Sequence, residues 1–182
     1  MIERLTTKDL LSQSLKELAK EKSIDKITVK EITDNCGFSV RTFYNNFQNI
    51  PELILWSYQE KLKRVFLKDN INLSWNELIF QGIMIIVNDY EYYKNAFHTF
   101  DYKSVQLVNL LDYAESAVVD FIKLKSNKKD LSEDETTCLK VYLNGIFLYC
   151  IQWTLKDMPV PVEKLALYFT NALPDSIRKY FQ

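Results

Sequence analysis

Only three glycines and four prolines occur in this chain of 182 residues, and this scarcity of helix-breaking residues is the feature that most constrains its fold. Leu, Ile, Lys, Glu and Phe recur at spacings of three and four residues, which is the period of an amphipathic helix. Apolar residues make up 47% of the sequence, enough to fill a sizeable core. The sequence therefore predicts an all-α protein rather than one with many strands and turns.

Capping boxes, in which a Ser or Thr is followed three residues later by Glu, mark the start of three helices. They are Thr28 with Glu31, Ser74 with Glu77, and Ser132 with Glu135. Together with the apolar spacing they predict helices over about 7–21, 28–35, 40–47, 49–67, 75–88, 90–97, 102–125, 133–155, 162–172 and 174–181. We expect the first three helices to form a small domain over residues 1–48 and the others a larger domain over 49–182.

A glycine separates the second and third of these helices. Gly37 is the residue best able to take the positive φ that ends a helix and turns the chain sharply. Ser39 follows and caps the third helix. Two short helices joined by a few residues that include a glycine are typical of a helix-turn-helix motif.

The third helix has an apolar and a polar side. Phe43 and Phe47 are four residues apart and share one face, which can close a core with Val29, Ile32 and Phe38. The other side carries Val40, Arg41, Thr42, Tyr44 and Asn45. This side is either solvated or enters a nucleic acid. A net charge of -1 gives little electrostatic support for the second interpretation.

The stretch "TVKEITDNCGFSVRTFYNNFQNIPELI", residues 28–54, resembles the DNA-binding domain of the TetR family of bacterial regulators. In that family a helix led by Thr, a Gly turn, a Ser cap, then Thr-aromatic-Tyr and a later Phe recur at this spacing. The rest of the chain is similar to the family only in length and helicity. The resemblance implies a three-helix DNA-binding domain followed by a helical ligand-binding and dimerisation bundle.

The resemblance also implies which residues read DNA. Val40, Arg41 and Thr42, the first residues after the Ser39 cap, correspond to the positions that contact base edges in the major groove. Their chemistry agrees, because Arg donates two hydrogen bonds to guanine and the methyl groups of Val and Thr contact the thymine methyl. We therefore expect Ser39 and these three residues to form the reading end of the helix.

Phosphate contacts are expected next to this end. The resemblance places Tyr44, Asn45 and the Thr28 hydroxyl on phosphates, which fix register without reading sequence. Many members of the family carry a lysine at the start of the fourth helix, where this chain has Ile50. Asn49 and the free N–H groups of that helix are expected to face a phosphate instead.

Two segments are similar to a subgroup of the family. "FQNI" and "KELAKEKSIDKITVKEI" resemble the regulators of dihydroxyacetone kinase more than the drug-efflux repressors. Members of that subgroup act as activators or together with a protein partner. The sign of regulation therefore stays open.

Aromatic residues are concentrated in the second part of the chain. They predict either an ordinary bundle core or a pocket for an apolar or aromatic ligand, since clefts between bundle helices are common ligand sites. The residues expected to line such a pocket are Trp56, Tyr93, Phe97, His98, Tyr142, Tyr149 and Trp153.

No motif for an enzyme or a metal centre is found. His98 is the single histidine, so a site with several histidines is excluded, and the three scattered glycines form no phosphate-binding loop. Cys36, Cys138 and Cys150 lack Cys-x-x-Cys spacing and are expected to be reduced thiols. We expect no enzymatic activity, no cofactor and no metal.

Neither targeting nor membrane insertion is predicted. The N-terminal "MIERLTTKDLL" is charged where a signal peptide needs an apolar run, and "LIFQGIMIIV" at 78–87 covers about half of a membrane span. A cytoplasmic protein without a membrane partner is expected.

The expected function is a ligand-responsive, homodimeric repressor that binds an inverted-repeat operator in double-stranded DNA. The apolar stretches "VYLNGIFLYCIQW" (141–153) and "LALYF" (165–169) are too broad for one buried face, which predicts the homodimer. Two alternatives remain: an activator of the same family, or a helical ligand- or protein-binding module that does not bind DNA. The effector is an unknown small molecule.

Overall fold

The computed structural model describes residues 5–99 and 105–181. In these ranges the chain is all-α, with two short 3-10 turns and no strand. The helices are α1 Thr7–Leu18, α2 Val29–Asn35, α3 Val40–Tyr44, α4 Ile50–Val65, α5 Trp75–Asn88, α6 Tyr90–Thr99, α7 Val105–Ser126, α8 Glu133–Leu155, α9 Val162–Asn171 and α10 Asp175–Arg178; the 3-10 turns are η1 Ile24–Lys26 and η2 Lys68–Asn70. None of the described helices is both long and apolar enough to cross a membrane.

The predicted capping boxes form as expected. In each, the Ser or Thr hydroxyl accepts from the Glu backbone N–H and the Glu carboxylate accepts from the cap backbone N–H. Because these caps fix the helix starts locally, α5 and α8 have the predicted bounds. A fourth box, formed by Thr6 and Asp9, begins α1 and was missed because Asp replaces the usual Glu.

Four helices are shorter than predicted by three residues or more; one of them is α4, which covers Ile50–Val65 instead of 49–67. α1 ends at Leu18 instead of 21, because the Asn95 amide of α6 donates to the carbonyls of Ala19 and Lys22 and takes the place of further helical turns. α3 ends at Tyr44 instead of 47, and α10 covers only four residues. The expected start of α7 at 102 lies outside the described residues.

The first three helices share a compact core. Leu11, Leu15, Ile32 and Phe43 are completely buried, and the ring of Phe47 lies 5.9 Å from that of Phe43. Each such side chain contributes about 1.5–3 kcal/mol by leaving water. Ile32, Phe43 and Phe47 are thus buried as predicted, and Val29 and Phe38 are half-buried and pack against this core.

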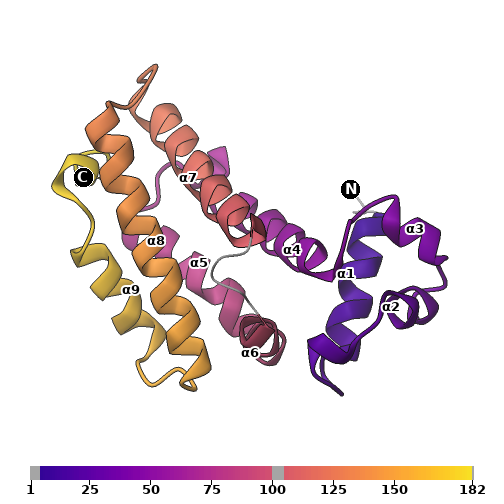
Figure 1. Cartoon of the computed structure of the whole chain (residues 1–182). Coiled ribbons are helices and arrows are strands. Elements are labelled where there is room, and N and C mark those ends of the chain that lie inside the picture. The colour runs from indigo at the N-terminus through magenta and orange to yellow at the C-terminus, as the bar shows by residue number, and fades with distance from the viewer. Residues whose placement is uncertain (1–4, 100–104, 182) are drawn as a thin grey trace.

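The remaining helices form a bundle. α5 packs on α9, α8 packs on α6, α7 and α10, and α4 lies against α5 and α7. Figure 1 shows that α4 leads from the three N-terminal helices into this bundle, and that α2 and α3 lie at the end of the molecule remote from α8 and α9. α4 is therefore the main covalent and packing connection between the two regions, and α1 also contacts it.

Candidate nucleic-acid interface and bundle cavity

The turn between α2 and α3 is fixed by backbone hydrogen bonds. Gly37 has a φ of 72°, as predicted, and its N–H donates to the Asp34 carbonyl at 3.3 Å. The Phe38 N–H donates to the Thr33 carbonyl at 2.8 Å. This pair of bonds is a Schellman motif, which ends a helix with a residue in the left-handed region. Phe38 then packs against the core. This contact and the two backbone hydrogen bonds fix the direction in which α3 leaves the turn.

The start of α3 is held by side chains. The Ser39 Oγ accepts from the Thr42 N–H at 3.1 Å, and the two hydroxyl oxygens lie 2.9 Å apart. The Asn46 amide donates to the Thr42 carbonyl at 2.8 Å and satisfies a carbonyl near the end of this short helix. The helix therefore keeps its shape although it has only five residues.

The outer side of α3 faces solvent. Tyr44 is 58% exposed and Val40 39%, and Arg41 and Asn45 are also exposed. Thr42 is half-buried. Within the described residues the Arg41 guanidinium has no hydrogen bond or ion pair, and its five donors are available to another molecule. The structure thus brings the predicted base-reading residues together on one accessible face.

Thr28 and Asn49 are occupied in helix caps. The Thr28 hydroxyl donates to the Glu31 carboxylate at 2.9 Å, and Lys22 also binds that carboxylate. The hydrogen bond from Lys22 has the largest effect on the pKa of Glu31, and the hydrogen bonds from Thr28 the next largest. Together they lower this pKa to about 2, well below its ordinary value. The Asn49 Oδ1 accepts from the Glu52 N–H at 2.9 Å, which leaves its amide N–H groups for a phosphate.

A basic residue that the sequence did not single out lies beside the start of α4. The Lys8 ammonium lies 5.1 Å from the ring of Phe47 and 5.7 Å from that of Trp56. Lys8, Gln48 and Asn49 border the same surface hollow. Lys8 thus brings a positive charge from α1 to the region where Ile50 replaces the expected lysine. The position of Lys8 depends on the packing of α1 on α4, so the sequence alone could not predict it.

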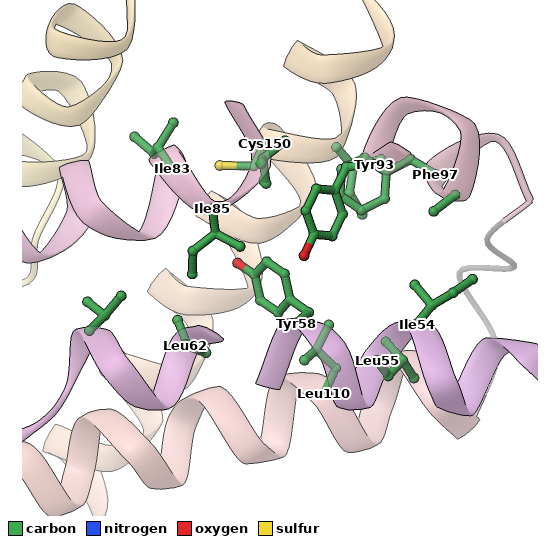
Figure 2. Close-up of a cluster of buried hydrophobic side chains, with 14 of the residues drawn as sticks. Ile54, Leu55, Tyr58, Leu62, Ile83, Ile85, Tyr93, Phe97, Leu110 and Cys150 are labelled. Carbon is green, nitrogen blue, oxygen red and sulfur yellow. The ribbon is translucent and has the colours of Figure 1, made fainter. Parts of the chain in front are cut away.

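An apolar cavity of about 80 Å³ lies inside the bundle. Its lining comes from α4, α5, α7, α8 and α9 and contains no charged residue. The lining residues are Tyr58, Leu62, Phe66, Trp75, Leu78, Ile79, Gly82, Ile83, Ile86, Leu111, Ala114, Val118, Leu143, Ile146, Phe147, Cys150 and Phe169. Figure 2 shows part of this region, with Tyr58, Leu62, Ile83 and Cys150 among the labelled side chains.

None of the seven residues predicted for a ligand pocket lines this cavity. Trp56 borders the hollow beside Lys8, and His98 is exposed on another surface. Tyr149 is 45% exposed on the outside of α8. The structure therefore does not bring these residues together in one site.

The other four predicted pocket residues are buried in packing contacts. The Tyr142 hydroxyl donates to the Phe169 carbonyl at 2.7 Å and accepts from the Trp75 indole. The Trp153 indole donates to the Val160 carbonyl at 2.9 Å. Tyr93 and Phe97 belong to the core between α6 and α4. Sequence periodicity does not distinguish aromatic residues that pack in the core from aromatic residues that face a cavity.

α6 joins the bundle to the N-terminal helices. The Asn95 side chain donates to the carbonyls of Ala19 and Lys22 at 3.1 and 3.0 Å and accepts from the Ile24 N–H at 2.9 Å. These three bonds fix the C-terminal end of α1 and the η1 turn to one residue of α6. A displacement of α6 would therefore move the first helix with it.

A second connection lies at the start of α6. Asp89 accepts from Lys16 of α1 at 2.8 Å and also from Lys61 of α4. Although burial opposes its ionisation, these two ammonium groups lower the pKa of Asp89 below its ordinary value. Burial lowers the pKa of Lys61 to about 8. One carboxylate thus connects α1, α4 and the α5–α6 junction.

Comparisons with known proteins identify the fold. No protein-family model matches the sequence. Three solved structures superpose on most of the chain: the dihydroxyacetone kinase operon activator DhaS (TM-score 0.62, 19% identity, 98% of this chain and 100% of that one), a TetR transcriptional regulator from Rhodococcus sp. RHA1 (0.62, 14%, 90% and 90%) and the TetR family repressor AlkX from Dietzia sp. strain DQ12-45-1b (0.61, 15%, 99% and 100%). The chain therefore has the all-α fold of TetR-family regulators, as the sequence resemblance implied.

One particular relative recurs in the sequence comparison. The HTH-type dhaKLM operon transcriptional activator DhaS of Lactococcus lactis subsp. lactis (strain IL1403) is 22% identical over 106 residues. The match spans 51% of this chain and 57% of that protein, a little more than half of the relative's length. It agrees with the subgroup that "FQNI" and its upstream segment resembled.

Proposed function

We propose that this protein is a DNA-binding transcription regulator that inserts α3 into the major groove. The observation that carries the proposal is the exposed face of α3, on which Arg41 has no partner among the described residues while a Schellman turn and the Ser39 cap fix the helix. In this arrangement Val40, Arg41 and Thr42 contact base edges. The TetR-type fold supports the same assignment.

The phosphate contacts flank this reading end. Tyr44 and Asn45, both exposed, bind the backbone on one side of α3. On the other side Lys8, the Asn49 amide and the N-terminus of α4 face a phosphate, with Lys8 supplying the charge that position 50 lacks. Thr28 contacts a phosphate only if its hydroxyl leaves the Glu31 carboxylate, so its contribution is the smallest.

A homodimer through α8 and α9 supplies the second reading helix. The outer faces of these helices carry large exposed apolar side chains, namely Val141, Leu148, Tyr149, Leu167 and Tyr168. A second copy of this chain buries them in a four-helix interface, because a monomer leaves them in water. Sedimentation at micromolar concentration is expected to give a dimer, and a Leu148→Glu, Leu167→Glu double variant a monomer with unchanged helicity.

The bundle cavity is proposed as the effector site. Ligand binding there shifts α4, which lines the cavity, and Asp89, which binds both Lys61 of α4 and Lys16 of α1, transmits the shift to α1. The two reading helices must match half-sites about 34–36 Å apart, or a multiple, so a small shift weakens operator binding. Repression relieved by ligand is the leading proposal. Activation is the second, supported by the similarity to DhaS.

Selection of duplex DNA from a random-sequence library with the purified full chain tests the proposal. An inverted repeat with a fixed half-site spacing is the expected result, and a reporter gene carrying it distinguishes repression from activation. Failure to enrich any sequence at low salt would leave the alternative of a helical module without DNA binding.

A further inference from the structure

Three residues at a spacing of three, Asp89, Tyr92 and Asn95, connect the start and middle of α6 to α1. Residues at this spacing share one face of a helix. Asp89 accepts from Lys16 of α1, and the same ammonium lies 5.6 Å from the Tyr92 ring. Asn95 bonds the backbone just beyond the end of α1. The bundle and the N-terminal helices therefore meet along this face of α6 as well as along α4.

The Asn95 side chain uses both its acceptor and its donors. Its oxygen accepts from the Ile24 N–H, and its amide N–H groups donate to the carbonyls of Ala19 and Lys22. Ala19 and Ile24 are buried, and no other hydrogen bond to these two carbonyls is found within residues 5–99 and 105–181. Only an amide combines an acceptor with two donors. Its removal therefore leaves backbone groups at the end of α1 without a protein partner.

Asn95 lies farther from α4 than the Asp89 contact does. Asp89 also binds Lys61 of α4, whereas Asn95 follows six residues, or about 9 Å, further along the chain. Figure 1 shows α6 below α4 and beside the C-terminal end of α1. A unit attached through α4 alone can tilt about that helix, and a second attachment away from α4 prevents the tilt.

The two polar attachments differ in strength. The ion pairs of Asp89 are partly exposed, and salt screens such pairs. The hydrogen bonds of Asn95 are uncharged, and loss of the side chain leaves buried backbone groups unpaired, which is costly. Asn95 is therefore the contact that best holds the orientation of the three N-terminal helices.

We propose that Asn95 is a positioning residue that sets which half-site spacing the protein accepts in its operator. It holds α1, and with it α2 and α3, in one orientation on the bundle. In a homodimer joined through α8 and α9, this orientation determines the separation and the relative rotation of the two α3 helices. The inference rests on the proposed function and names a determinant of the DNA that is bound.

The geometry of DNA makes spacing a sensitive readout. One additional base pair between two half-sites moves them about 3.4 Å further apart and turns one relative to the other by about 35°. A reading unit held in one orientation does not follow this change. A unit held by α4 alone can follow part of it.

The test uses the operator obtained by selection, with its central spacer shortened or lengthened by one base pair, titrated at fixed salt. For the wild type, each change is expected to weaken binding about tenfold. For Asn95→Ala the loss is expected to fall to about threefold or less, with an unchanged base preference within each half-site. Asn95→Asp is expected to behave like Asn95→Ala, because a carboxylate cannot donate to the two carbonyls.

Asn70→Ala is the matched control. The Asn70 amide donates to the carbonyls of Arg64 and Val65 at 3.1 and 2.9 Å, so it also satisfies carbonyls at the end of a helix, but both partners belong to α4 within the bundle. This variant is expected to keep the tenfold dependence on spacing. Three results would each overturn the proposal: a wild type indifferent to spacing, a wild-type profile in Asn95→Ala, or the same flattening in Asn70→Ala.

A measurement without DNA gives a second readout. Spin labels are introduced as unnatural amino acids at two exposed positions, Lys30 of α2 and Asp120 of α7. Labelled protein is diluted into unlabelled protein, so that the measured distance lies within one chain. A narrow distance distribution is expected for the wild type and Asn70→Ala, and a broader one for Asn95→Ala. Equal widths for the wild type and Asn95→Ala would contradict the role of Asn95.

The two readouts separate this inference from the proposed function. A failed selection of duplex DNA together with a broader distribution in Asn95→Ala alone would reject the regulator and keep Asn95 as the residue that orients the N-terminal helices. A selected operator with identical spacing profiles and identical distributions in the wild type and Asn95→Ala would keep the regulator and reject the role of Asn95.

Discussion

The three N-terminal helices and the bundle differ in whether their buried polar side chains have hydrogen-bond partners. In the first region the buried Ser14 hydroxyl donates to the Ile32 carbonyl at 2.7 Å, and the Thr33 hydroxyl donates to a carbonyl of its own helix. Among the described residues, the buried side-chain atoms without a partner all lie in the bundle, on Tyr92, Tyr93 and Ser176. Hydrogen bonds thus hold the N-terminal helices in one arrangement, whereas the bundle contains buried hydroxyl groups without a hydrogen-bond partner.

This difference fits the two tasks proposed above for the two regions. A surface that reads DNA must keep fixed positions before it meets its partner, and satisfied polar groups rigidify and specify a single arrangement. A region that responds to a ligand must gain something when the ligand arrives. In the proposed function, a ligand that fills the apolar cavity supplies that gain.

The largest expected effect tests whether the two regions unfold separately. Phe43→Ala removes a completely buried ring from the small N-terminal core and is expected to cost about 3–5 kcal/mol of unfolding free energy. Hydrogen exchange is expected to show lost protection in α1–α3 with protection kept in α7 and α8. Simultaneous loss in all these helices would mean that the molecule is one cooperative unit and that the comparison between its regions is wrong.

The second effect concerns the reading face. Arg41→Ala is expected to weaken binding to the selected operator by about 1–3 kcal/mol and to relax the preference at one base pair in each half-site. Titration of operator variants at fixed salt measures this. Tyr44→Phe is the control, because loss of a phosphate contact weakens binding to all sequences by similar factors. An equal loss on all operator variants for Arg41→Ala would make Arg41 a backbone contact.

A smaller effect concerns the unfilled space in the bundle. Gly82 lines the cavity in the middle of α5, and a methyl group at this position meets no atom within 4 Å. Gly82→Ala is therefore expected to raise the unfolding free energy by about 0.5–1 kcal/mol through helix propensity. Urea denaturation measures the gain. Destabilisation would show that the cavity wall is already filled, contrary to the contrast drawn between the regions.

The smallest effect concerns charge at the α1–α4 contact. Lys8→Ala is expected to leave the sequence preference unchanged and to reduce the slope of log K against log salt concentration by about 1 for each phosphate that Lys8 neutralises. Binding titrations at several salt concentrations measure the slope. Lys20→Ala, a change of the same kind in an exposed residue after α1, is the control. Equal slopes for wild type and Lys8→Ala would remove Lys8 from the interface.

The N-terminal region could be predicted well from the sequence because its determinants are local. The Thr28–Glu31 box, the positive φ at Gly37 and the Ser39 cap all depend on residues five or fewer positions apart. The exposed side of α3 followed from the spacing of Phe43 and Phe47. For the same reason the bounds of α5 and α8 were predicted correctly.

The arrangement of the bundle could not be predicted, because its determinants are tertiary. Tyr58 and Tyr93 are 35 positions apart in the sequence, and the contact of their rings depends on how α4 and α6 pack. Tyr149 and Tyr142 lie on the same helix, yet one is exposed and the other is hydrogen-bonded in the core. Lys8 likewise reaches the start of α4 only through the folded contact of α1 with α4. Composition identifies such residues as aromatic or basic but does not tell which surface each occupies.

The connection from Lys61 of α4 through Asp89 to Lys16 of α1 has a consequence for dose response. Coupling between two binding sites is reciprocal, so if an effector weakens operator binding by some factor, operator binding weakens the affinity for the effector by the same factor. Copies that occupy an operator then respond at a higher effector concentration than free copies do. A cell that makes more of this protein than it has operators would fill the free copies first, and the regulated gene would respond only after that reserve is saturated.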